Sequence, residues 1–244
     1  MSARDVQSQG PAEASEKTIA FLLYSGLTAF DLAGPLQVIS RLAETHPEIR
    51  PVVVGERIEP MASDAGVDLI PDRAFADVPH PYALVVPGGS IPTLRAMSNR
   101  VIRAYLRSAA ESAAIVASVC SGALILASVG LLEGRNATTH WAVARILESY
   151  GATYRRARWV EDGKFMLSAG VSAGIDMGLQ LAAWLTDEAT AREVQISLDY
   201  DPQPPFGRLD YHDTGLYLWS RRAIASLGAP LLTAGPKRRT RQHR

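Results

Sequence analysis

The chain has 244 residues, and its 25 basic and 25 acidic side chains give a formal net charge of zero. This balance produces no overall field that would attract nucleic acid or a lipid surface. A hydrophobic content of 47% is enough for a proper core. The single cysteine excludes an intramolecular disulfide and fits a reducing compartment. Residues 1–17 lack the apolar segment of a signal peptide, and no apolar stretch reaches membrane length, so we expect a cytoplasmic protein with neither membrane nor nucleic-acid partner.

Residues 18–198 alternate between short apolar runs and segments with helical periodicity. The runs that predict strands are residues 18–24, 51–55, 82–86, 115–119, 136–139, 153–160 and 164–168. The segments that predict helices are residues 30–44, 99–112, 121–129, 140–150, 172–185 and 187–198. Residues 56–77 combine weak alternation with turn residues and indicate a hairpin. This order predicts an α/β fold with a doubly wound, mostly parallel sheet flanked by helices.

Composition divides the chain into three parts. Residues 1–17 are polar and small, and we expect a disordered leader. Residues 18–207 are expected to form a single α/β domain, which ends in a proline-rich arm after Leu198. Residues 208–244 form a C-terminal extension that ends in KRRTRQHR, a basic tail without apolar partners. Such a tail is most simply a solvated segment.

Cys120 lies where the apolar run 115–119 is followed at once by a small-residue helix. The sequence Ser118-Val119-Cys120-Ser121-Gly122 has the outline of a nucleophile elbow, in which small neighbours allow the backbones to approach closely. A helix N-terminus favours a thiolate, and the N–H of Ser121 points into the same space. Gly89 could offer a second N–H to a charged intermediate. The alternative is that Cys120 is a small buried hydrophobe, as free cysteines often are.

Asp31 follows the first predicted strand, and the carboxyl ends of parallel strands meet at one edge of a sheet. The loops before Asp31, at Gly88-Gly89 and at Cys120 should therefore converge. Two negative charges there would raise both pKa values, so one shared proton would make Asp31 a proton shuttle. An N-cap is its alternative role. His140 could orient the site or donate a hydrogen bond, or be a capping or packed side chain.

At these residues the chain resembles the ThiJ/PfpI superfamily, and most closely its isonitrile hydratase branch. The motifs that carry the resemblance are FDLAGP (30–35), VVPGG (85–89), VCSGA (119–123), GLLEGRNATTHW (130–141), SAGID (172–176) and YDPQPPF (200–206). Protease-like members have a histidine directly after the cysteine, where this chain has Ser121. Many members have a glutamate where Asp31 stands, and the hydratases have an aspartate.

The resemblance implies a flavodoxin-like, class I glutamine amidotransferase-like fold and a homodimer. It also implies that Cys120 adds to an isonitrile carbon to form a thioimidate, which Asp31 protonates before activating water. Gly89, Ser121 and His140 would bind the substrate or stabilise charge. No metal and no organic cofactor is expected. Two alternatives stay open: a glyoxalase or deglycase that acts on reactive carbonyls, and a non-enzymatic cysteine sensor of redox state or ligand.

Overall fold

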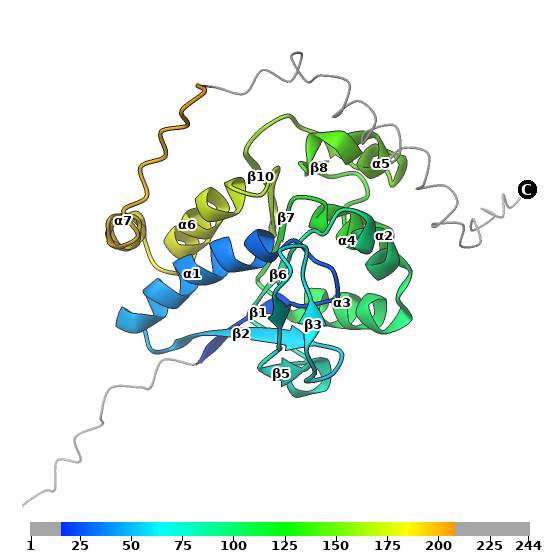
Figure 1. Ribbon diagram of the computed structural model, residues 1–244, viewed down its shortest axis with the longest axis horizontal. Coiled ribbons are helices and arrows are strands. Elements are labelled where there is room, and N and C mark those ends of the chain that lie inside the picture. Colours follow the sequence, from blue (N-terminus) through cyan, green and yellow to red (C-terminus); the bar gives the residue numbers. More distant parts are fainter. Residues whose placement is uncertain (1–15, 208–244) are drawn as a thin grey trace, which may run out of the picture.

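The computed structural model describes residues 16–207, and its centre is a seven-stranded sheet (Figure 1). The strand order is β10-β11-β7-β6-β1-β2-β5, and every neighbouring pair is parallel except β10 with β11. These strands are β1 (Lys17–Leu22), β2 (Ile49–Gly55), β5 (Arg73–Ala74), β6 (Ala83–Val86), β7 (Ile115–Val119), β10 (Trp159–Asp162) and β11 (Phe165–Ser168). The predicted mostly parallel sheet is thus confirmed.

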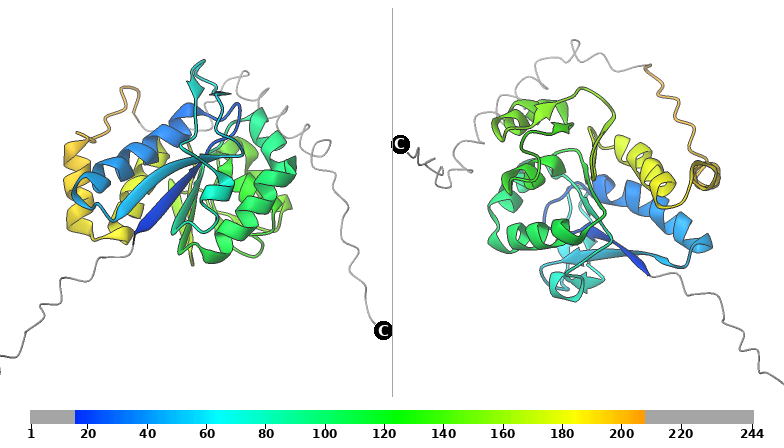
Figure 2. Two further views of the ribbon diagram at one scale, coloured as in Figure 1. Left: turned by 90° about the horizontal axis from the view of Figure 1, so that it is seen from below. Right: turned by 180° about the vertical axis from the view of Figure 1, so that it is seen from behind.

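Helices cover both faces of this sheet (Figure 2). One face carries α1 (Ala29–Thr45), α6 (Ala173–Leu185) and α7 (Glu188–Ser197). The other carries α2 (Ile91–Ser98), α3 (Arg100–Ser112) and α4 (Gly122–Ser128). The remaining elements are the hairpin β3 (Met61–Ala62) and β4 (Asp68–Leu69), the pair β8 (Asn136–Ala137) and β9 (Thr153–Tyr154), η1 (Phe75–Asp77), η2 (Trp141–Val143) and α5 (Ala144–Ser149). Because helices pack on both faces, β6 and β7 are buried along their whole length, as continuous apolar runs require.

The order of the strands places a topological switch point between β1 and β6. The chain leaves β1 for β2 on one side and later returns to β6 on the other, so α1 and α2 diverge to opposite faces. A crevice forms at the carboxyl ends of strands where the connections diverge in this way. Asp31 follows β1, and Gly88 and Gly89 follow β6. The fold therefore directs these residues to one place before any side-chain contact is considered.

The structure departs from the predicted elements at several places. Lys17 belongs to β1 and not to a leader, because its N–H donates to Glu48 O at 2.7 Å and so extends the pairing with β2. The predicted helix 140–150 is a 3₁₀ turn followed by the short α5. Helix α2 was not predicted, since it has only eight residues and Ser90 before it has a φ of 50°. Residues 1–15 of the leader and residues 208–244 lie outside the described residues.

Residues 16–207 contain no helix that is both long and apolar enough to cross a membrane.

Candidate active site

Cys120 connects β7 to α4 in a strained conformation. Its φ is 57°, in the left-handed region that residues with a side chain rarely adopt. Two hydrogen bonds hold it there: Cys120 N–H donates to Ser168 O at 3.1 Å, and Thr139 Oγ1 donates to Cys120 O at 2.8 Å. A Cβ at Gly122 would overlap Val86 O, so only glycine fits the second position after the cysteine. The predicted sharp strand-to-helix turn is confirmed.

Asp31 lies in the first turn of α1 and is completely buried. It does not cap the helix, because Asp64 Oδ1 accepts from the N–H of Ala29 at 2.9 Å from the β3–β4 hairpin. Instead, Asp31 Oδ2 accepts from the N–H of Gly88 at 3.0 Å. Its Oδ1 has no hydrogen-bond partner among the described residues. The N-cap alternative is therefore wrong, and a carboxyl group with an unused oxygen is buried beside the elbow.

The loop after β6 ties the Asp31 and Cys120 loops together. The N–H of Thr28 donates to Gly88 O at 2.9 Å, and the N–H of Gly89 donates to Ser121 Oγ at 3.1 Å. The three loops converge as predicted, but the role expected for Gly89 needs correction. Its N–H, predicted to face a ligand, is committed to Ser121. The groups that stabilise a charge on the sulfur, and so lower the pKa of Cys120, are the backbone N–H and the side chain of Ser121.

The acid and the thiol both hold their protons more tightly than usual. Burial is the main cause that raises the pKa of Asp31 from 3.8 to about 7, against the opposing hydrogen bonds from Gly88 and Cys120. Burial and the nearby Asp31 raise the pKa of the Cys120 thiol, although Ser121 lowers it. The expected preference for a thiolate at a helix N-terminus is therefore wrong in the resting protein, because burial outweighs the helix end. The prediction that the two groups raise each other's pKa is correct only for the thiol, since Cys120 lowers the pKa of Asp31 and burial is what raises it.

His140 lies at a cleft next to the elbow. The cleft has a volume of about 500 Å³, and its walls include Phe30, His140, Trp141 and Arg156. Thr139, which holds Cys120 O, is also in its wall. The Nδ1 atom of His140 accepts from the N–H of Ala142 at 3.3 Å, so the side chain caps η2. Cys120 is 8% exposed.

Two residues of the site were missed from the sequence. Tyr24 follows β1, and Thr93 lies in the first turn of α2. Thr93 Oγ1 is 2.8 Å from Ser121 Oγ and 3.2 Å from Tyr24 Oη. The signal that could have found Thr93 is Pro92, because proline is common in the first turn of a helix. That helix would start directly after the Gly88-Gly89 loop.

Fold and site together define an α/β protein with a buried cysteine at a nucleophile elbow and a buried aspartate beside it. Residues 17–183 match the DJ-1/PfpI family, and the chain belongs to that family. It is 39% identical to an isonitrile hydratase of Pseudomonas putida over 189 residues, which cover 77% of this chain and 80% of that protein. It is 34% identical to a deglycase of Thermococcus kodakarensis over 99 residues, 40% of this chain and 59% of that protein. A crystal structure of a ThiJ/PfpI family protein from Pseudomonas syringae superposes with a TM-score of 0.81 at 32% identity, covering 96% of this chain and 98% of that chain.

Proposed function

We propose that the protein is an isonitrile hydratase, which converts an isonitrile and water to an N-substituted formamide. The observation that carries the proposal is the buried pair of Cys120 and Asp31, in which a carboxyl group with a pKa of about 7 lies beside the thiol. Such an acid can both accept and return a proton near neutral pH. The 39% identity to the Pseudomonas putida isonitrile hydratase supports the same assignment.

In the first step the Cys120 thiol adds to the isonitrile carbon. The Asp31 carboxylate accepts the S–H proton as the S–C bond forms, and then gives that proton to the same carbon. The product is a thioimidate, with one new S–C bond, one new C–H bond and Asp31 again ionised. The N–H of Ser121, which reaches the sulfur, is suited to stabilise charge during this addition.

In the second step water cleaves the thioimidate. Asp31 takes a proton from water as the oxygen bonds to the carbon, and the nitrogen receives that proton. The C–S bond then breaks, the hydroxyl proton returns to the sulfur, and the formamide leaves. Every atom comes from the isonitrile and water, so the cycle needs no redox partner.

The cleft beside the elbow is the proposed entry for the substrate. Its aromatic lining from Phe30, His140 and Trp141 suits an apolar substituent on the isonitrile nitrogen. Gly89 contributes by holding Ser121 and not by binding the substrate directly. A homodimer stays a prediction, which light scattering of the purified protein tests.

A steady-state assay with a simple aryl isonitrile tests the function. We expect isonitrile to disappear as formamide appears, no turnover by Cys120→Ala, and a loss of at least about 100-fold in Asp31→Asn, the range for removing a general acid–base. A wild-type protein that leaves isonitrile untouched but consumes methylglyoxal would be a deglycase-type enzyme. Inertness toward both, with selective oxidation of Cys120 by mild peroxide, would favour the sensor.

A further inference from the structure

A row of buried hydroxyl groups leads from the back of the crevice to Cys120. Tyr24 Oη is 3.2 Å from Thr93 Oγ1, which is 2.8 Å from Ser121 Oγ, and a hydrogen bond from the side chain of Ser121 lowers the pKa of the adjacent Cys120 thiol. Thr93 is fully buried, and Ser121 and Tyr24 are 4% and 5% exposed. The row joins three separate segments: the end of β1, the first turn of α2 and the elbow. Of these three residues, only Ser121 takes part in the proposed reaction.

Each hydroxyl has one proton, so the row can be satisfied in two directions. In the outward direction Tyr24 donates to Pro87 O at 3.1 Å, Thr93 donates to Tyr24, and Ser121 donates to Thr93. Ser121 Oγ then accepts from the Gly89 N–H and its own proton points away from the sulfur, while the neutral thiol donates its proton to Asp31. This direction suits the resting protein, in which the thiol keeps its proton.

In the inward direction every hydroxyl turns toward Cys120. Tyr24 donates to Thr93, Thr93 donates to Ser121, and Ser121 donates to the sulfur. Ser121 Oγ then accepts from both Thr93 and Gly89, so its two lone pairs are used and its proton is free for a thiolate. The heavy atoms stay in place, and the hydroxyl protons alone rotate. A hydrogen bond to a charged group is stronger than one between neutral groups, so ionisation favours this direction.

We propose that Thr93 and Tyr24 are positioning residues for Cys120, forming a reversible hydroxyl row that turns the Ser121 proton toward the sulfur when the thiol ionises and so makes Ser121 a donor for the thiolate. The inference deepens the proposed function and rests on it only in taking Cys120 as the nucleophile. Burial raises the pKa of Tyr24, so the end of the row keeps its proton at neutral pH. The negative charge of Asp31 raises the pKa of both Tyr24 and Cys120, whereas the charge of Asp64, from the β3–β4 hairpin, acts on Tyr24 and Asp31. Asp31 therefore opposes a thiolate, which makes a donor at Ser121 the more necessary.

The test is the rate at which iodoacetamide alkylates Cys120, measured across pH without any isonitrile. Thr93→Val keeps the shape of the side chain and removes the hydroxyl. We expect alkylation about tenfold slower at a fixed alkaline pH, with the pH midpoint moved upward, because one hydrogen bond to a charged group is weakened. Thr93→Ser should restore the wild-type profile, and Tyr24→Phe should slow alkylation about threefold.

Two comparisons separate a relay from a packing effect. Thr138 is also fully buried, and its hydroxyl donates to Ala157 O at 3.1 Å outside the row, so Thr138→Val should leave the alkylation profile unchanged. In a Ser121→Ala background, Thr93→Val should have no further effect, because the row no longer reaches the sulfur. A wild-type profile in Thr93→Val, or a tenfold effect that persists without Ser121, would overturn the proposal. Since the readout uses no isonitrile, failure of the hydratase assay leaves this test intact.

Discussion

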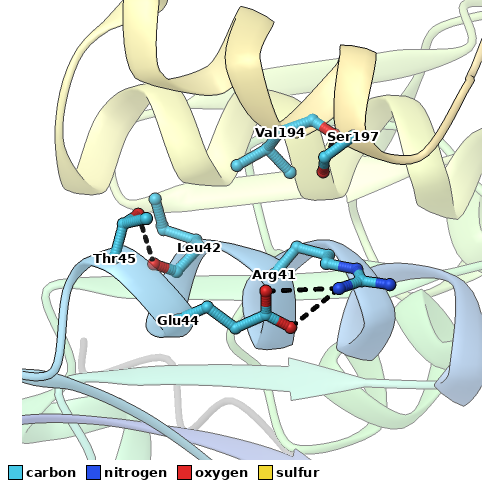
Figure 3. A network of polar contacts seen from close by, with 6 residues as sticks. All are labelled: Arg41, Leu42, Glu44, Thr45, Val194 and Ser197. Atoms are coloured by element: carbon cyan, nitrogen blue, oxygen red, sulfur yellow. Dashed lines mark hydrogen bonds and ion pairs between the residues drawn. The ribbon is translucent and has the colours of Figure 1, made fainter.

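The two ends of helix α1 have hydrogen-bonded polar groups in opposite surroundings. At its N-terminal end Asp31 is fully buried and accepts from the Gly88 N–H at 3.0 Å. At its C-terminal end Arg41 Nη1 donates to both carboxylate oxygens of Glu44 at 2.9 and 3.2 Å, and those side chains are 42% and 61% exposed. Figure 3 shows this second end, where Thr45 donates to Leu42 O below α7. Both ends of the helix therefore have a carboxylate that accepts hydrogen bonds, and they differ in exposure.

Burial, and not hydrogen bonding, distinguishes the electrostatics of the two ends. Water solvates a charge at the exposed end whether or not its partner is present, so the ion pair changes little. At the buried end the cost of removing a carboxylate from water raises the pKa of Asp31 to about 7. The same helix therefore carries a solvated ion pair at one end and a carboxyl group with a raised pKa at the other.

The largest expected effect comes from removing the charge at the buried end. Because the folded pKa of Asp31 is raised above 3.8, its contribution to stability is present below pH 4 and is lost as pH rises to about 7. That loss amounts to about 4 kcal/mol. Asp31→Asn cannot titrate, so its free energy of unfolding relative to wild type should increase by about this amount between pH 4 and pH 8. Urea denaturation at both pH values measures it, and an unchanged difference would mean that Asp31 is not buried as a charge.

Filling the space between the three loops should have the next largest effect. A Cβ at Gly88 would lie 2.6 Å from Ser121 Oγ and 2.8 Å from Asp31 Oδ2. Gly88→Ala should therefore destabilise the protein by about 1–3 kcal/mol and reduce isonitrile turnover by at least about tenfold, because overpacking displaces both groups. Gly66→Ala is the control: its φ is 75°, but a Cβ there meets no described atom within 4 Å. It should cost about 1 kcal/mol and leave turnover unchanged.

The convergence of the loops was predictable, and the state of the groups within it was not. Strand patterns and the elbow sequence place Asp31, Gly88 and Cys120 at the carboxyl ends of β1, β6 and β7, which are adjacent in the sheet. The protonation of the thiol depends on how far the packed helices exclude water from it. No local sequence pattern predicts that degree of burial. Thr93 was missed because α2 has only eight residues and follows Ser90, whose positive φ no sequence pattern indicates.

Removal of a helix cap of intermediate exposure should lower the free energy of unfolding by an amount between those expected at the two ends of α1. Asn99 Oδ1 accepts from the N–H groups of Val101 and Ile102 at 2.8 and 3.2 Å at the start of α3. Asn99→Ala should lower the free energy of unfolding by about 1 kcal/mol, the usual worth of such a cap, while Asn99→Asp should retain most of it. Thermal unfolding of the three proteins measures the order. A loss as large as that from Gly88→Ala would show that exposure does not rank these sites.

The smallest effect is expected at the exposed end of α1, in the coupling free energy between Arg41 and Glu44. A double-mutant cycle of Arg41→Ala and Glu44→Ala isolates the ion pair from the separate effects of each side chain. We expect a coupling free energy of about 0.3 kcal/mol, as for other i,i+3 pairs on helix surfaces, and a smaller one at high salt, because solvent and ions screen both charges. A coupling above about 1 kcal/mol would mean that the geometry of the pair outweighs its exposure. Burial alone would then not account for the contrast between this ion pair and the buried Asp31.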